Sequence, residues 1–256
     1  MQNNTFSGLF VGQNLITLKE VDSTNTFLKD ALSKSTPLLE GTVIMAEKQY
    51  AGRGQTNNTW LSEERKNLTF SILLNPSFLP VHRQFELNKA ISIAINDVLK
   101  AYAGDTALIK WPNDSYLGNR KVGGMLIENI VTGNRIRHAI IGIGLNVNQT
   151  IFPSNLKNVT SLKQELHKDY DLTNLLGELC TAIEVRYLQL RAGHGEKITS
   201  DYMGRLYLIN KWANFKTEKG VLRGKITGVS NSGQLEMETV EGLTLFGNKE
   251  IEFINV

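Results

Sequence analysis

The strongest constraint on the fold is a pair of apolar segments, residues 122–130 and 137–146, with a short polar connection between them. Both segments are rich in isoleucine, valine and leucine, which favour β-strands. The connection contains Thr132-Gly133-Asn134, and glycine and asparagine tolerate the backbone angles of tight turns. The two segments therefore predict an antiparallel β-hairpin.

The rest of the chain up to Gly204 alternates between strand and helix patterns, and after Gly204 only short strand patterns follow. Apolar residues recur at helical spacing in residues 22–32, 83–102 and 172–190, and shorter β-rich runs occupy 42–47, 68–74 and 107–111. After Gly204 the patterns are four short β-like runs, 221–229, 234–240, 243–246 and 250–253, broken by polar turns. We expect an α+β chain: a mixed or antiparallel sheet with helices on one face in residues 1–204, and a small β-barrel in 205–256.

Composition and charge exclude several classes of protein. Hydrophobic residues make up 41% and charged residues 21% of the 256 residues, as is usual in soluble globular proteins. The net charge of +3 is too small to indicate a nucleic-acid-binding protein. The single cysteine, Cys180, lies in the pattern of the 172–190 helix, so we expect a small buried apolar residue. No leader pattern opens the sequence and no run of about 18 apolar residues occurs, so we expect a cytoplasmic protein that does not cross a membrane.

Two glycine-containing segments are candidate anion sites. In Gly52-Arg53-Gly54 the glycines expose backbone N–H groups, and the arginine adds a bidentate donor suited to phosphate or carboxylate. Taken alone, the same residues also fit an ordinary turn. Further on, Lys121 leads a strand that contains Gly123 and Gly124, so a substrate could lie against the glycines with Lys121 at its charged end. The alternative is a hairpin with a solvated lysine.

A third glycine pattern lies on the second strand of the hairpin. Gly142 and Gly144 stand at alternate positions and face one side of the strand, which leaves a slot where side chains would otherwise stand. A glycine-kinked core strand would show the same pattern. We expect the two glycine-containing strands to form a narrow trough for a substrate. Lys121 and Arg53 would neutralise two negative groups that meet at the end of this trough. The four histidines are far apart in sequence, so we assign no metal ligands.

Five motifs together resemble the biotin–protein ligase family, in order and approximate spacing. The resemblance covers nearly the whole chain and is to the monofunctional type, without an N-terminal winged helix. It implies a class II synthetase-like catalytic fold with a C-terminal SH3-like barrel. It also implies that biotin, ATP and Mg²⁺ are used to form biotinyl-5′-AMP, and that biotin then passes to a lysine of a biotin carboxyl carrier domain. The motifs are Ser23-Thr24-Asn25, Gly52-Arg53-Gly54, Lys110-Trp111-Pro112-Asn113-Asp114, Lys121-Val122-Gly123-Gly124 and Gly142-x-Gly144-x-Asn146.

The resemblance also implies roles for individual residues. Lys121 resembles the lysine that contacts the biotin carboxylate and the α-phosphate, Trp60 a stacking surface for adenine, and Asp114 a partner for the incoming lysine amine. Lys121, Arg53 and Asp114 are thus the implied catalytic residues. The implied biotin-binding residues are Ser23, Thr24, Asn25, Gln49, Gly52, Arg53, Lys121, Gly124 and Gly142, and the implied nucleotide-binding residues are Arg53, Gly54, Gln55, Trp60, Asn113, Lys121 and Asn146.

One position departs from the family pattern. Many members carry an arginine directly after Gly-Arg-Gly, where this chain has Gln55 followed by uncharged residues 56–58. A neutral side chain attracts an anionic adenylate less strongly, so we expect other groups to compensate.

Two other functions fit parts of the pattern. A lipoate–protein ligase or octanoyltransferase also acylates a carrier lysine, but a plain acyl chain does not need the hydrogen-bonding set around Gln49 and Arg53. A non-catalytic binding protein would use the C-terminal barrel as an interaction module. Only about twenty residues precede Ser23, so we expect no operator DNA binding; a homodimer is possible.

Overall fold

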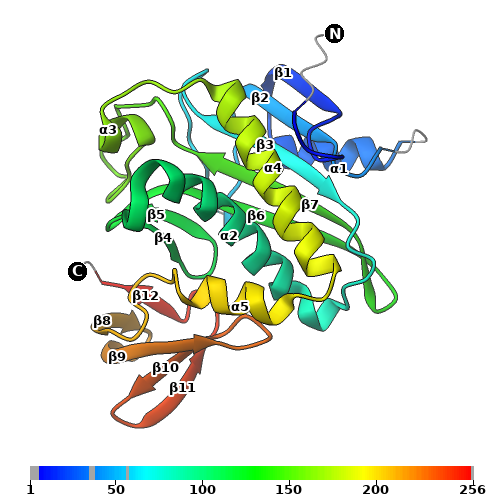
Figure 1. The fold of residues 1–256 in the computed structure, drawn as a ribbon. Helices are drawn as coiled ribbons and strands as arrows, with labels where there is room; N and C mark the ends of the chain where they lie inside the picture. Colours follow the sequence, from blue (N-terminus) through cyan, green and yellow to red (C-terminus); the bar gives the residue numbers. More distant parts are fainter. Residues whose placement is uncertain (1–5, 35–37, 56–57, 255–256) are drawn as a thin grey trace.

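The computed structural model describes residues 6–34, 38–55 and 58–254 and contains a larger and a smaller β-sheet (Figure 1). The larger sheet has the order β1-β2-β3-β7-β6-β5-β4. Its β1 and β2 are parallel and its other neighbours antiparallel, so the predicted mixed sheet is confirmed. Its strands are β1 (Leu15–Val21), β2 (Val43–Gln49), β3 (Leu68–Leu74), β4 (Ala107–Lys110), β5 (Asp114–Leu117), β6 (Arg120–Thr132) and β7 (Arg135–Leu145).

The predicted hairpin forms the centre of this sheet. Strands β6 and β7 pair antiparallel with Gly124 opposite Gly144 and Leu126 opposite Gly142. Strand β3 pairs with the other side of β7 and places Thr69 opposite Gly144. Because side chains alternate between the two faces of a strand, these five positions share one face of the sheet.

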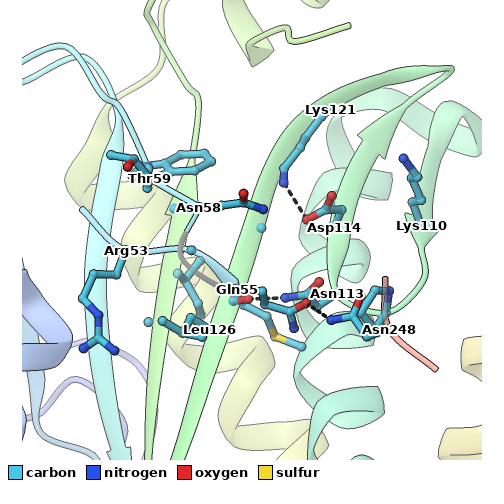
Figure 2. A pocket seen from close by; sticks show the side chains of 18 of the residues that line it. Arg53, Gln55, Asn58, Thr59, Lys110, Asn113, Asp114, Lys121, Leu126 and Asn248 are labelled. Carbon is cyan, nitrogen blue, oxygen red and sulfur yellow. Dashed lines mark hydrogen bonds and ion pairs between the residues drawn. The ribbon is translucent and has the colours of Figure 1, made fainter. Parts of the chain in front are cut away.

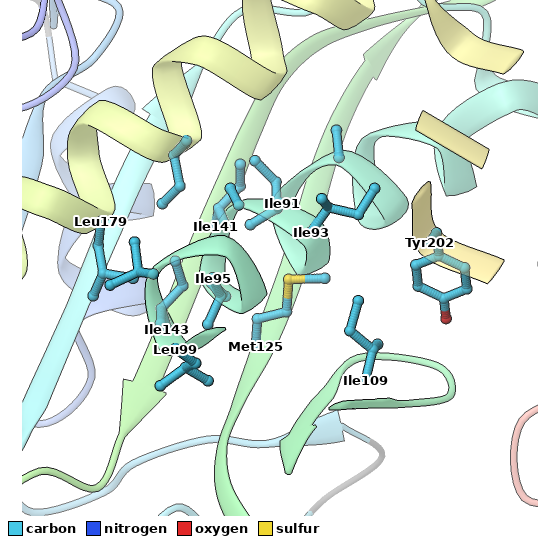
Figure 3. Close-up of a cluster of buried hydrophobic side chains, with 14 of the residues drawn as sticks. Ile91, Ile93, Ile95, Leu99, Ile109, Met125, Ile141, Ile143, Leu179 and Tyr202 are labelled. Carbon is cyan, nitrogen blue, oxygen red and sulfur yellow. The ribbon is translucent and has the colours of Figure 1, made fainter. Parts of the chain in front are cut away.

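Two long helices cover the opposite face, α2 (Gln84–Ala103) and α4 (Leu172–Arg191) (Figure 1). Ile141, Ile143 and Met125 point from β7 and β6 into the apolar core beneath them (Figure 3). Ile91 and Leu179 meet these side chains from the helices and are fully buried. Each such side chain contributes about 1.5–3 kcal/mol through burial. Cys180 lies in the same core, as expected, and burial raises the pKa of its thiol to about 12.

Helix α1 (Thr24–Leu32) lies on the other face of the sheet. Its Leu28 is fully buried in a small cluster with Ile44, Leu73 and Ile140, from β2, β3 and β7. These three residues occupy strand positions next to those whose side chains face α2 and α4, so their own side chains point to the opposite face. Helix α1 lies over β2, β3 and β7, and the glycine-bearing part of the face lies beside the N-terminal end of α1, where Asn25 meets the Gly142 position.

The C-terminal strands form a five-stranded antiparallel sheet of order β11-β10-β9-β8-β12. The sequence predicted four strands in a barrel; the structure adds β8, and the hydrogen-bonded order of the described strands is open, ending at β11 and β12. Phe215 and Ile226 of this sheet belong to the same apolar cluster as the main core. The division at residues 204 and 205 therefore stays a prediction. The strands are β8 (Trp212–Thr217), β9 (Gly220–Val229), β10 (Leu235–Thr239), β11 (Gly242–Phe246) and β12 (Ile251–Phe253).

Two short helices complete the chain, α3 (Leu162–Leu166) and α5 (Gly195–Met203), and α5 joins α4 to the C-terminal sheet. Trp111 is 4% exposed and donates from its indole Nε1 to the carbonyl of Gly233 at 2.9 Å, which ties the β4 end to the smaller sheet. No helix in the described part of the chain is long and apolar enough to cross a bilayer.

Candidate active site

A cavity of about 490 Å³ lies on the glycine-bearing face, between the N-terminal end of α1 and the C-terminal sheet (Figure 2). Most of the residues singled out from the sequence line it together. Gly52 and Asn146 do not, and their predicted binding roles gain no support from their position. The lining residues that had been predicted are Ser23, Thr24, Asn25, Gln49, Arg53, Gly54, Gln55, Trp60, Asn113, Asp114, Lys121, Gly124 and Gly142.

One end of the cavity is a buried polar cluster at the start of α1. Ser23, Thr24 and Asn25 are each 3% exposed. The backbone N–H of Thr24 donates to Gln49 Oε1 at 2.9 Å, and Ser71 Oγ lies 2.6 Å from Asn25 Oδ1. These groups need partners once they are out of water, so the cluster is held in one arrangement.

Arg53 and Asn25 share one carboxylate, that of Glu128. Asn25 Nδ2 donates to Glu128 Oε2 at 2.8 Å, and Arg53 Nη2 donates to Glu128 Oε1 at 3.1 Å. Figure 2 places Arg53 on the opposite side of the cavity from Lys121. The sequence predicted that these two cations meet at one end of a trough. In the structure they stand apart, each beside its own carboxylate.

Lys121 pairs with Asp114 across neighbouring strands. Lys121 Nζ lies 2.7 Å from Asp114 Oδ1, and both side chains are at least two-thirds buried. Gly124 makes the pair possible, because a Cβ at that position would stand 2.9 Å from Asp114 Oδ1 and 3.4 Å from Lys121 Nζ. The strand glycine thus clears space for an ion pair of the site.

The slots beside Gly142 and Gly144 are also filled by side chains of the site. A Cβ on Gly142 would stand 2.3 Å from Asn25 Oδ1, and one on Gly144 would stand 2.3 Å from the indole of Trp60. The expected open trough is therefore packed by Asn25 and Trp60. A Cβ on Gly123 would stand 2.8 Å from the Gly144 carbonyl oxygen, and Gly123 does not line the cavity.

Two of the residues assigned to nucleotide binding, Asn113 and Asn146, make side-chain hydrogen bonds to backbone carbonyls of the protein itself. Asn113 Nδ2 donates to the Met125 carbonyl, and Asn146 Nδ2 donates to the Thr160 carbonyl at 3.0 Å. Trp60 Nε1 and Asn146 Oδ1 are buried without a hydrogen-bond partner among the described residues. Buried polar atoms are rarely left unpaired in folded proteins, so Trp60 Nε1, whose residue lines the cavity, is a candidate contact for a bound molecule. The predicted roles of Asn113, Asn146 and Trp60 toward a nucleotide are untested.

The C-terminal sheet supplies a wall that was not predicted. Gln55 Oε1 accepts a hydrogen bond from Asn248 Nδ2 at 2.7 Å, which joins the glycine-rich loop to this sheet; residues 56 and 57 of the loop lie outside the described part. Sequence gave no signal for this wall, because it lies nearly 200 residues from the loop. The wall comprises Asn248, Lys249, Ile251, Glu252 and Phe253.

Lys110 is a further cavity residue that the sequence assignment missed. Its Nζ donates to the Tyr116 hydroxyl at 3.0 Å and lies 4.8 Å from the ring centre of Phe253 and 5.1 Å from that of Tyr116. No carboxylate of the described residues lies within ion-pairing distance of it. Burial lowers the pKa of Lys110, while burial raises the pKa of Tyr116 to about 12.

No group of three or more histidine, cysteine, aspartate or glutamate side chains in the described residues could hold a metal ion. Mg²⁺ does not require such a cluster, because it usually binds through one or two carboxylates together with substrate phosphates. Asp114 and Glu252 are the carboxylates on the cavity wall.

The α+β fold and a cavity with a hydrogen-bonding end and several cations define a class of enzyme that binds small anionic substrates. Residues 17–146 match the Biotin/lipoate A/B protein ligase family, and the chain belongs to that family. It is 31% identical over 245 residues to the bifunctional ligase/repressor BirA of Bacillus subtilis, which covers 94% of this chain and 74% of the relative. It is 33% identical over 133 residues to the biotin–[acetyl-CoA-carboxylase] ligase of Paracoccus denitrificans, covering 51% of this chain and 53% of the relative.

A solved structure extends the similarity to the whole fold. The biotin protein ligase from Aquifex aeolicus in complex with biotin and ATP superimposes with a TM-score of 0.79 at 29% sequence identity, over 95% of this chain and 99% of that one. The similarity therefore includes the C-terminal sheet as well as the larger one.

Proposed function

We propose that the chain is an ATP-dependent biotin–protein ligase, which forms biotinyl-5′-AMP and transfers biotin to a lysine of a biotin carboxyl carrier domain. The observation that carries the proposal is the single cavity that joins the buried polar cluster at the start of α1 to the Lys121–Asp114 pair. Membership of the family and the named activities of the relatives support it.

The polar cluster suits the ureido ring of biotin. Thr24, Asn25 and Gln49 offer donors and acceptors at a depth where a ligand group would be desolvated. A site built to hydrogen-bond a polar ring discriminates against a ligand without one, because its own groups would be left unpaired. This favours biotin over a lipoyl or octanoyl chain.

The first step needs positioning and charge neutralisation. The biotin carboxylate attacks the α-phosphorus of ATP, the bond from this phosphorus to the bridging oxygen breaks, and pyrophosphate leaves with the bonding electrons. We assign to Lys121 the stabilisation of the charge that develops on the α-phosphoryl oxygens. Mg²⁺ carried by ATP would add further neutralisation, and Asp114 would be its carboxylate ligand on the protein.

In the second step the carrier lysine nitrogen attacks the carbonyl carbon of the adenylate. An amide bond forms, the bond from the carbonyl carbon to the phosphate oxygen breaks, and AMP leaves. We assign to Asp114 the holding of the incoming amine and the uptake of its proton. The Gln55–Asn248 contact would keep the loop over the adenylate and compensate for the missing arginine.

Other features of the proposal concern partners and place. The carrier belongs to a biotin-dependent carboxylase, as the names of the relatives suggest. With a net charge of +3, the chain has little electrostatic drive toward DNA, so we propose no operator binding. A cytoplasmic location completes the proposal. A gel shift would test DNA binding, and sedimentation measurements would distinguish a monomer from a homodimer.

The decisive experiment incubates the protein with ATP, biotin and a biotin carboxyl carrier domain, and reads the carrier by intact mass. We expect the mass of one biotinyl group to be added, and no addition when ATP is omitted or when the target lysine is replaced by arginine. Modification with lipoate and not with biotin would assign the chain to the lipoate branch of the family. No modification with either acid would refute the proposal.

A further inference from the structure

Lys110 is held in the cavity wall by aromatic rings in place of a carboxylate. Arg53 and Lys121 each have a carboxylate partner, Glu128 and Asp114. Lys110 instead contacts Tyr116 and Phe253, which come from β5 and from β12 of the C-terminal sheet. A ring face attracts an ammonium group only weakly, so Lys110 keeps most of its capacity to bind an anion.

The strand register places Lys110 in line with the reaction centre. Lys110 on β4 is opposite Asp114 on β5, and Asp114 is opposite Gly124 on β6. The three positions form one row across the sheet, and Lys110 stands at its β4 edge. Neighbouring strands lie about 4.8 Å apart, so Lys110 is roughly 10 Å from the Gly124 position along this row.

The direction of the row matters because displacement at phosphorus is in line, with the attacking and leaving oxygens on opposite sides of the phosphorus. In the proposed function, biotin enters from the side of Gln49 and Asn25, and its carboxylate reaches the α-phosphate beside Lys121. The leaving group then departs toward β4 and the C-terminal sheet. Figure 2 shows Lys110 on this side of Asp114 and Lys121, opposite Arg53.

We propose that Lys110 binds the β- and γ-phosphates of ATP, and then the pyrophosphate product, and that Phe253 is the positioning residue that holds its ammonium group in the cavity. This inference rests on the proposed function for the direction of attack. It also gives the C-terminal sheet a part in the first step, since the wall that contains Phe253 closes the pyrophosphate end of the site.

The contacts of Lys110 suit such a role. Its Nζ has three donors, and among the described residues one of them is used, in the bond to the Tyr116 hydroxyl. The side chain is partly desolvated, and charge-assisted hydrogen bonds are stronger where water is excluded. Burial lowers the pKa of Lys110, and the nearby carboxylates of Asp114 and Glu252 oppose this shift.

The test compares Lys110→Met with Lys110→Arg, which keeps the charge. We expect Lys110→Met to raise both the KM for ATP and the inhibition constant of inorganic pyrophosphate roughly 10- to 100-fold, while the KM for biotin stays within about twofold. Transfer to the carrier from supplied biotinyl-5′-adenylate should also be unchanged, because that step contains no pyrophosphate. Lys219→Met removes one charge from the β8–β9 turn and serves as the control for net charge.

Phe253 is tested by Phe253→Leu and Phe253→Tyr. The leucine variant keeps apolar bulk without a ring face, so the KM for ATP should rise about three- to tenfold while that for biotin does not. The tyrosine variant keeps the ring and should restore the normal value. Equal changes in both KM values would indicate a merely structural role for Phe253 and overturn its assignment.

Direct binding keeps this inference separate from the activity itself. Calorimetric titration with inorganic pyrophosphate requires no turnover, and we expect binding by the wild-type protein that Lys110→Met weakens. No binding by the wild-type protein, or equal binding by the variant, would overturn the assignment. Loss of transfer from supplied adenylate in Lys110→Met would also overturn it, by placing Lys110 at the second step. Failure of the wild-type protein to transfer biotin from the adenylate would instead refute the proposed function.

Discussion

Lys121 Nζ and Asp114 Oδ1 lie 2.7 Å apart on neighbouring strands, above a glycine that leaves room for both. In the proposed mechanism this pair would couple the two implied catalytic groups: Asp114 would orient Lys121 before the substrates bind, and the anions of the first step would compete with Asp114 for the same ammonium group. If Lys121 then turned to the α-phosphate, Asp114 would be left available for the amine of the second step. One ion pair thus links the requirements of both half-reactions.

Lys121→Ala tests the first of these requirements. It should reduce biotin-dependent ATP–pyrophosphate exchange by about 10²–10³-fold, the loss expected when one charge-stabilising donor is removed. Asp114 loses its ion-pair partner, so we expect a lower unfolding temperature while the variant stays folded. Lys48→Ala, which breaks an exposed pair with Glu20, is the matched control and should exchange normally. Near-normal exchange by Lys121→Ala would remove Lys121 from its role.

Gly142→Ala tests the packing of the polar cluster. The added methyl group would stand 2.3 Å from Asn25 Oδ1, so Asn25 must leave its contacts with Ser71 and Glu128. We expect the KM for biotin to rise at least about tenfold and stability to fall by about 1–3 kcal/mol, the usual cost of overpacking. Gly204→Ala is the control, because its Cβ would meet its nearest neighbour at an ordinary 3.5 Å. An unchanged KM for biotin in Gly142→Ala would show that Asn25 takes no part in binding.

The sequence predicted the elements with strong apolar periodicity. The 68–74 strand and the 83–102 and 172–190 helices match β3, α2 and α4 within a residue or so. The missed elements lack that signal. Strand β1 is a half-exposed edge strand, and β8 buries only Phe215 fully, so neither shows a clear alternation.

The residues alone marked the candidate site at its glycines and at Lys121 and Arg53, and the family resemblance supplied its other predicted side chains; Glu128, Lys110 and the C-terminal wall were missed. Glu128 stands two residues after Leu126 and four after Gly124 on one face of β6, so the alternation that singled out the glycines could have found it. The filling of the glycine slots by Asn25 and Trp60 depends on contacts distant in sequence. So does the wall at Phe253, which no local pattern reveals.

Glu184→Ala tests how the N-terminal segment is held. The Glu184 carboxylate is 5% exposed and accepts hydrogen bonds from the backbone N–H groups of Leu9, Phe10 and Val11, at 2.7, 2.7 and 2.9 Å. Its loss leaves three donors without partners, so the free energy of unfolding should fall by about 2–4 kcal/mol. Urea denaturation measures this change.

Two further variants calibrate that measurement. Glu184→Gln keeps one acceptor oxygen and should lose less stability than Glu184→Ala. Glu241→Ala, in the exposed turn before β11, should change stability by less than about 0.5 kcal/mol. Equal denaturation midpoints for Glu184→Ala and Glu241→Ala would show that the carboxylate does not anchor the segment.

The dependence of ATP binding on pH follows from the surroundings of Lys110. Burial lowers the pKa of Lys110 below its ordinary value, and only the protonated amine binds phosphate, so affinity is present at neutral pH and is lost as pH rises through the lowered pKa. The groups that face it are Asp114 and Tyr116 of β5 and Glu252 of β12, and burial raises the pKa of Tyr116 to about 12. The KM for ATP should therefore begin to rise at a lower pH than it would if Lys110 had the pKa of an ordinary lysine.

In Lys110→Arg, the KM for ATP should stay constant up to about pH 10, because a guanidinium keeps its proton there. Steady-state kinetics from pH 7 to 10 with fixed biotin compares the two proteins, and superimposable profiles would show that Lys110 does not titrate in ATP binding.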